Sequence, residues 1–211
     1  MMEDTRSKIL QSAKELFILQ GYKKTTIRQI VKRSGVLIGS IYYLYKNKEE
    51  IFKSLILETF KKSDEVICNY LGEDFDPVLR YGLSCAIELT AVEEDECICE
   101  IYYEAYSLKS IFDGLVDAAA KRSQILFKNY NPDFEFEDYY IRTLAIKGAM
   151  RSFIANKYLT RQISLEKRID MILDFSLQTY NVPKTEIHQT KKHILQLKNK
   201  IKEFALLIAE N

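Results

Sequence analysis

The sequence lacks the motifs on which most enzyme sites depend. Only two histidines and seven glycines occur among 211 residues, and both histidines, His188 and His193, lie near the C-terminus. There is no phosphate-binding loop, no dinucleotide-binding glycine fingerprint and no serine nucleophile elbow. We therefore expect no enzymatic activity and no cofactor.

Long apolar runs are also missing. No stretch approaches the length of a membrane span, and the N-terminus has no signal-peptide core. We expect a cytoplasmic protein without a membrane partner. In a reducing compartment the four cysteines, which are few for this length, should be thiols. They are Cys68, Cys85, Cys97 and Cys99.

The cysteines and histidines do not have the spacing of a metal site. On a helix, Cys97 and Cys99 diverge by about 200°, and no histidine is near them to complete a tetrahedral site. His188 and His193 diverge as well. We expect no metal, whereas a thiol-based redox sensor stays open as an alternative function.

Residues 25–51 contain the most informative pattern in the chain. Thr25 or Thr26 can cap a helix with apolar residues at helical spacing, and Gly35 can end that helix in the left-handed conformation. A short aromatic segment follows at once. This order of helix, tight turn and short helix is typical of a DNA-binding helix-turn-helix.

The short segment from Gly39 to Tyr45 can be held by its neighbours if Ile41 and Tyr45 point into a small core. Its other face would then be free to enter a major groove, where hydroxyl groups reach phosphates or base edges. Lysines at the start of the next helix could bind a phosphate of the DNA backbone, which the N-terminus of that helix also attracts. The outward residues would be Ser40, Tyr42 and Tyr43, and the lysines are Lys46 and Lys48.

About the first 60 residues resemble the TetR family of bacterial one-component repressors. The similarity includes Gly21-Tyr22, Thr25-Thr26 and an upstream apolar stripe formed by Ile9, Leu10, Ala13, Leu16 and Phe17. The resemblance implies a homodimeric transcriptional regulator, a repressor released from double-stranded operator DNA by a small-molecule effector. The expected DNA-binding residues are Thr26, Arg28, Ile38, Gly39, Ser40, Tyr42, Tyr43, Lys46 and Lys48.

Three residues depart from the family pattern. Leu37 stands where a small hydroxyl residue is usual, Ile38 where a polar or basic residue is common, and Leu44 where an aromatic residue or histidine is common. The short helix after the turn therefore lacks the N-cap that is usual in the family. We expect a weaker or more apolar readout that favours thymine. A helical interaction module with weakened or lost operator binding is the alternative.

Charge is divided unequally along the chain. Residues 1–62 contain 13 basic and 6 acidic side chains, residues 63–181 contain 12 and 21, and residues 182–211 contain 6 and 3. The net charge of +1 thus conceals a basic N-terminal part and an acidic middle. This division suits a protein whose N-terminal part meets phosphate.

The pattern beyond residue 48 is helical, and strand-like alternation is absent. We predict an all-α fold with an N-terminal helix-turn-helix domain of three helices over residues 1–48, here called the head. Residues 49–211, here called the body, should form a helical bundle for effector binding and dimerisation. The predicted body helices cover residues 48–70, 76–91, 97–108, 110–129, 138–158 and 164–180, followed by an appended helix at about 184–209.

Family resemblance implies that the last two body helices form a four-helix dimer interface with their symmetry mates. Residues 138–158 offer small side chains for close helix approach, and residues 164–180 offer an apolar stripe. An ordinary intramolecular helix pair is the alternative. The predicted interface residues are Leu144, Ala145, Gly148, Ala149, Ser152, Ile169, Ile172, Leu173, Ser176 and Leu177.

The tail after Pro183 has a heptad seam with one polar interruption. Three heptads suffice for a packed arm, so we expect a helix docked on the body or across the dimer, with a membrane-surface helix as the alternative. The seam residues are Ile187, Thr190, Ile194, Leu197, Ile201, Phe204 and Ile208.

Aromatic residues are dense in the body and could line a pocket for an apolar or aromatic effector. A solid core is the competing interpretation. Glu100 and Glu104 share a helix face and could attract a cation beside aromatic rings. The predicted pocket residues are Tyr81, Tyr102, Tyr103, Tyr106, Phe112, Phe127, Met150 and Phe153.

Overall fold

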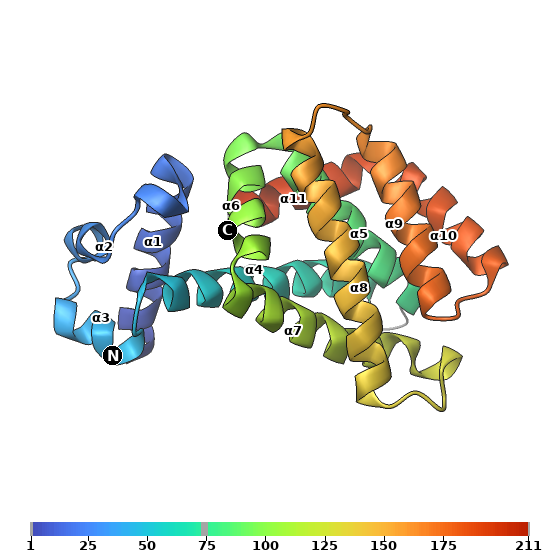
Figure 1. Cartoon of the computed structure of the whole chain (residues 1–211), viewed down its shortest axis with the longest axis horizontal. Coiled ribbons are helices and arrows are strands. Elements are labelled where there is room, and N and C mark those ends of the chain that lie inside the picture. The colour runs from blue at the N-terminus through green and yellow to red at the C-terminus, as the bar shows by residue number, and fades with distance from the viewer. Residues whose placement is uncertain (1, 73–75, 211) are drawn as a thin grey trace.

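The computed structural model describes residues 2–72 and 76–210, and these residues form eleven α-helices and two short 3-10 helices, without a strand (Figure 1). The all-α prediction is confirmed. In chain order the elements are α1 (Met2–Lys24), α2 (Ile27–Ser34), α3 (Ile38–Leu44), α4 (Lys48–Leu71), α5 (Pro77–Glu94), α6 (Glu96–Ser107), α7 (Lys109–Phe127), η1 (Lys128–Tyr130), α8 (Phe136–Ala155), η2 (Asn156–Tyr158), α9 (Leu165–Thr179), α10 (Lys184–Gln196) and α11 (Lys198–Glu210).

The head is built from α1, α2 and α3. Thr26 begins α2 with a capping box: its hydroxyl accepts from the backbone N–H of Gln29, and the Gln29 side chain accepts from the Thr26 N–H. Gly35 ends α2 with φ 66°. A side chain at this φ would be strained, so Gly35 fixes the tight turn into α3.

An aromatic cluster joins α1 to the beginning of α4. The ring of Phe52 stacks on Tyr22 with centroids 4.5 Å apart and meets Phe17 edge-on at 5.2 Å. Phe17 and Phe52 are fully buried. Helix α4 then runs on into the body, as Figure 1 shows, so that one continuous helix belongs to both parts.

Helix α5 is the centre of the body. Asp76 caps it through two backbone N–H groups, and Pro77 occupies its first turn, where no N–H is needed. Its side chains are buried on nearly all sides from Val78 to Val92. A helix that is apolar all round must be enclosed, and helices from both ends of the body pack against it.

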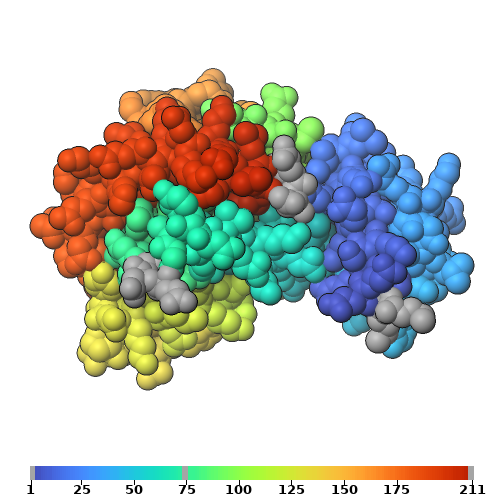
Figure 2. Space-filling view, turned by 180° about the vertical axis from the view of Figure 1, so that it is seen from behind, coloured from blue at the N-terminus to red at the C-terminus, as the bar shows by residue number. Residues whose placement is uncertain are grey.

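The tail docks on its own body. Helices α10 and α11 lie beside α5, and Figure 2 shows the tail stretched over one face of the molecule. The predicted single helix is divided at Leu197, whose backbone N–H donates to His193 O. The other six seam residues are buried. Three tail lysines form ion pairs with the body: Lys191 with Asp170 and Asp174, Lys198 with Glu166, and Lys202 with Glu94.

Across the described ranges 2–72 and 76–210, the model contains no helix that combines the length and the apolar character needed to cross a membrane.

Candidate DNA-binding surface and regulatory body

Helix α3 has two faces with different environments. Ile41 is fully buried and Tyr45, just after the helix, is nearly so, and these two residues attach α3 to the head. Four large side chains are left exposed, with exposed fractions of 78% for Leu37, 47% for Ile38, 53% for Tyr42 and 78% for Tyr43. The head therefore presents one mainly apolar and aromatic helix face.

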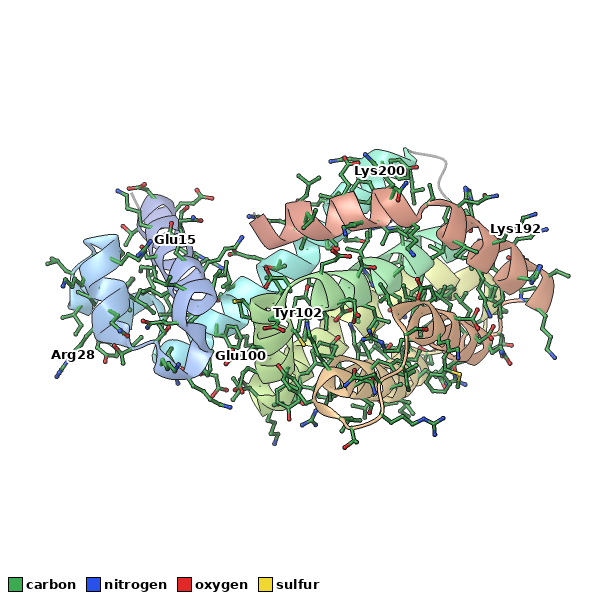
Figure 3. All side chains as sticks on the ribbon, turned by 90° about the horizontal axis from the view of Figure 1, so that it is seen from above. Glu15, Arg28, Glu100, Tyr102, Lys192 and Lys200 are labelled. Atoms are coloured by element: carbon green, nitrogen blue, oxygen red, sulfur yellow. The ribbon has the colours of Figure 1, made fainter. Side chains whose placement is uncertain are left out.

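Most of the other predicted DNA-binding residues lie on the surface of the head. Thr26, Arg28, Gly39 and Lys46 are exposed, and Ser40 is half-buried. Figure 3 shows Arg28 at the outer end of the head, away from the body. Arg28 stands in the first turn of α2, where the helix dipole also favours a phosphate group.

Lys48 is placed differently from the prediction. Its Nζ donates to the backbone carbonyls of Tyr22, at 2.6 Å, and Thr25, at 2.8 Å, and lies 4.0 Å from the centre of the Tyr22 ring. Burial lowers the pKa of this lysine. The ammonium group holds the turn between α1 and α2 against α4, so we withdraw Lys48 from the expected phosphate contacts.

Two small cavities lie inside the body. One measures about 30 Å³ and the other about 20 Å³, each enough for about one water molecule. Ser84 and Glu88 line both. Of the predicted pocket residues, Tyr102 and Tyr106 line the first cavity, and Tyr81 and Met150 line the second.

The other four predicted pocket residues line neither cavity, because they pack against other side chains. Tyr103 contacts the Tyr158 ring at 4.9 Å, and Phe153 packs against the core. Phe112 lies 5.9 Å from the Tyr106 ring, and Phe127 stacks on Tyr180 at 4.6 Å. A role of these four residues in effector binding stays a prediction.

A buried polar cluster borders both cavities. Lys147 Nζ donates to Glu88 Oε2 at 3.1 Å and to the Tyr106 hydroxyl at 2.8 Å, and Tyr106 in turn donates to Glu88. Burial and the Glu88 carboxylate raise the pKa of Tyr106 well above its ordinary value, so the phenol stays protonated. Sequence reasoning missed this cluster, although Lys147 stands on an otherwise apolar stripe of α8 beside Ile146 and Met150.

A second ionic cluster adjoins it. Arg122 Nη1 donates to Ser84 Oγ at 2.8 Å and lies 3.4 Å from Asp64, which also binds Arg80. The Arg122 guanidinium lies 4.7 Å from the Phe60 ring centre. The interior of the body is thus charged as well as aromatic.

Helix α6 contacts both the cavity and the head. Tyr102 and Tyr106 face the cavity, whereas the carboxylate of Glu104 lies 2.5 Å from Nζ of Lys23 on α1. Glu104 raises the pKa of Lys23. The cation that Glu104 attracts is therefore a lysine of the head, and Figure 3 places the neighbouring Glu100 at the same junction.

A larger open groove of about 710 Å³ lies between α9 and the tail. Its apolar lining comes from both sides, and charged residues that include the three ion-paired tail lysines stand around it. The apolar residues are Leu165, Ile169, Leu173, Ile194, Leu195 and Ile201.

Only part of the predicted dimer face is accessible. On α8, Leu144, Ala145 and Ser152 are exposed, and Gly148 and Ala149 are half-buried. On α9, Ile169 is half-buried, while Ile172, Leu173, Ser176 and Leu177 are buried in the protomer's own core, so their prediction as interface residues is wrong. The exposed large apolar residues of these two helices are Ile141, Leu144, Met171 and Phe175.

The buried cysteines are poor candidates for a thiol sensor. All four are free thiols, and burial raises the pKa of Cys85 to about 11 and also raises the pKa of Cys99. A thiol with a raised pKa is a poor sensor because the thiolate is the reactive form. Among residues 2–72 and 76–210, no group of three potential metal ligands occurs.

Comparison with known proteins gives consistent results for sequence and fold. Residues 9–55 match the family model described as "Bacterial regulatory proteins, tetR family". The HTH-type transcriptional regulator YxaF of Bacillus subtilis (strain 168) is 43% identical over 76 residues, which are 36% of this chain and 40% of that protein. QacR of Staphylococcus aureus, an HTH-type transcriptional regulator, is 29% identical over 182 residues, which are 81% of this chain and 94% of QacR.

Two solved structures share the fold at low sequence identity. RolR in complex with resorcinol has a TM-score of 0.64 at 16% identity, covering 86% of this chain and 93% of RolR. SmeT, the repressor of the Stenotrophomonas maltophilia multidrug efflux pump SmeDEF, has a TM-score of 0.58 at 18% identity, covering 83% and 91%.

Proposed function

Because the chain belongs to the TetR family of helix-turn-helix transcriptional regulators, which are not enzymes, we propose that it is a homodimeric repressor released from its operator by a small molecule. In this proposal residues 1–48 bind DNA, and residues 49–211 carry dimerisation and effector binding. The observation that carries it is the exposed face of α3 on the basic N-terminal part of an otherwise acidic chain.

The head has the chemistry of a major-groove reader. The tyrosine hydroxyls of α3 reach phosphates or base edges, while Arg28 and Lys46 supply charge for the backbone. Two heads related by a twofold axis would lie in successive major grooves, with half-site centres about 34–36 Å apart.

The exposed apolar residues of α8 and α9 support the proposed dimer. Ile141, Leu144, Met171 and Phe175 are accessible in one protomer, and large apolar patches on soluble proteins mark contact surfaces. Ala145 and Gly148 have little side chain to hold a partner helix away. Pairing of α8 and α9 with their symmetry mates would cover these side chains.

The effector would bind the body by enlarging the cavities beside Glu88, Tyr106 and Lys147. A drug-sized ligand needs about 300 Å³ or more, so at these cavities it must select a more open conformation of the body. Helix α6 supports a route for release, because the helix that carries Tyr102 and Tyr106 also carries Glu104, which pairs with Lys23 of the head.

The DNA-binding proposal is tested by in vitro selection of random duplexes on the full-length protein, followed by titration of an enriched duplex over a series of salt concentrations. We expect one enriched sequence with dyad symmetry and an affinity that falls steeply with salt. Enrichment of no sequence, with only weak binding to every duplex, would favour the interaction module instead.

The effector proposal is tested by thermal shift with a panel of small apolar and aromatic compounds. Resorcinol and triclosan, each named in a complex with a structural neighbour, are the first members of the panel. We expect at least one compound to raise the melting temperature and to weaken operator binding. If no compound does both, effector release fails while DNA binding stands.

A further inference from the structure

Two apolar side chains at the start of α3 have no structural task in the protomer. Leu37 occupies the N-cap position but gives no side-chain hydrogen bond to the helix, and neither Leu37 nor Ile38 belongs to the core. Their exposed fractions of 78% and 47% contrast with full burial of Ile41, one helical turn further on. The core attachment of α3 is therefore complete without them.

The position of these side chains decides what they can contact. In helix-turn-helix complexes the N-terminal residues of the second helix contact base edges, and Leu37 and Ile38 are the residues at that end of α3. The next residue, Gly39, has open space where a Cβ would stand, so no side chain of its own holds the helix start away from the groove.

Leucine and isoleucine offer neither a hydrogen-bond donor nor an acceptor. In the major groove the one apolar group on the base edges is the C5-methyl of thymine, whereas guanine, cytosine and adenine present polar groups there. An aliphatic side chain over those groups would remove them from water without a replacement partner, and this is unfavourable. The occupant that matches this surface is therefore an A·T pair with its thymine methyl toward the protein.

We propose that Leu37 and Ile38 are specificity-determining residues that read thymine methyl groups in the operator. This inference rests on the proposed DNA-binding function and adds to it the class of base that the start of α3 selects. The charge of the N-terminal part supports DNA as the occupant of this apolar surface, because residues 1–62 carry 13 basic and 6 acidic side chains.

The experiment removes single methyl groups from the DNA. The probe is the duplex enriched by in vitro selection on the full-length protein. Deoxyuridine replaces thymidine at one position at a time, first in one half-site and then in both. Uracil keeps the Watson–Crick edge of thymine and its single major-groove polar group, the O4 acceptor, and lacks only the methyl. At the contacted positions we expect affinity to fall about fourfold per methyl, or about fifteenfold when both half-sites are changed.

The protein variants assign the effect to the side chains. With Leu37→Ser and Ile38→Ser, thymidine and deoxyuridine duplexes should bind equally at the position that each residue faces. Leu37→Ser also supplies the hydroxyl cap that α3 lacks, so a loss of the methyl effect would not come from unfolding. Leu19→Ser is the matched control, because Leu19 is 73% exposed on α1 and should keep the full difference between the two duplexes.

The outcomes are distinct. If the enriched duplex binds tightly but no uracil substitution weakens it, or if the methyl effect persists in both serine variants, the inference is overturned and the DNA-binding function stands. If selection enriches no duplex, the proposed function itself fails, and the inference fails with it.

Discussion

Two lysines close together in the sequence have different environments. Lys46 has an exposed side chain, whereas Lys48 donates to the carbonyls of Tyr22 and Thr25. Those acceptors lie more than twenty residues earlier in the chain, so the spacing of the lysines could not reveal them. A lysine that follows α3 closely in the sequence can therefore either face solvent or hold the head together through backbone hydrogen bonds.

Lys48→Met should therefore affect stability more than DNA binding. Loss of two hydrogen bonds from a charged group should lower the free energy of unfolding by about 1–2 kcal/mol, as measured by urea denaturation. The slope of operator affinity against salt should stay unchanged. Lys46→Ala is the comparison: we expect unchanged stability and a salt slope smaller by about one charge. If Lys48→Met instead kept the stability of the wild-type protein and reduced the salt slope, Lys48 would be a phosphate contact.

The buried lysine of the body, Lys147, shows why the contact partner of a side chain could not be predicted from the sequence. The capping residues Thr26, Gly35 and Asp76 were predictable because a cap acts on the backbone a few residues away. Lys147 pairs with Glu88, which is 59 residues away on another helix. Periodicity placed Lys147 on α8 but could not say which distant partner it would meet.

At the scale of elements, the bounds of the helices were easier to predict than which neighbour each helix face packs against. The predicted segment 164–180 agrees closely with α9, but the prediction selected the stripe of Ile172, Leu173, Ser176 and Leu177 as a dimer surface. That stripe packs inward. An apolar stripe shows that a helix is covered, and it does not distinguish a neighbour in the same chain from one in a second copy.

The corrected dimer face leads to a prediction about assembly. Met171→Glu and Phe175→Glu should give folded monomers, because both side chains are exposed in the protomer and a charge there harms only a partner contact. Light scattering measures the mass, and circular dichroism the fold. Ile172→Glu should instead unfold the protein, since Ile172 is fully buried.

Leu206→Glu serves as the control for this set, because Leu206 is an exposed leucine of the tail. It should leave the mass at that of a dimer. If Met171→Glu and Phe175→Glu also remain dimeric, the interface lies elsewhere, and the exposed surface of the tail is the next place to test.

The contact between α5 and α10 gives a second prediction for elements. A Cβ at Gly82 would lie 3.1 Å from Cγ2 of Thr190, closer than ordinary van der Waals contact. Gly82→Ala should lower stability to urea, because overpacking costs about 1–3 kcal/mol and the gain in helix propensity is about 1 kcal/mol.

Thr190→Ser removes the crowded methyl and should restore stability in the double variant. The double variant would then be at least as stable as the wild-type protein, because the alanine keeps its helix propensity. A Gly82→Ala variant of wild-type stability that Thr190→Ser does not change would mean that α10 does not pack on α5 at this distance.

At the scale of the whole molecule, the head and body meet through α4 and through the contact between α1 and α6 (Figure 1). The three-helix head was predictable because its motif is local. The closed interior was not, because aromatic density in a sequence is the same for a cavity and for a solid core. Most of that aromatic density is core in this conformation, and the two cavities inside the body are each about the size of a water molecule.

The ion pair between Glu104 and Lys23 should couple effector binding to DNA binding. For a compound that the thermal-shift panel identifies, we expect it to lower operator affinity by about 5–150-fold, and the operator to lower affinity for the compound by the same factor. Glu104→Gln should bring that factor toward one without preventing compound binding, because the amide weakens the link between α6 and α1 and leaves Tyr102 and Tyr106 in place. Titrations of compound and operator, each with and without the other, measure both factors.

Glu96→Gln is the control, since Glu96 lies exposed on the same helix and loses the same charge. A coupling factor equal to wild type in Glu104→Gln would show that the signal does not pass through this ion pair.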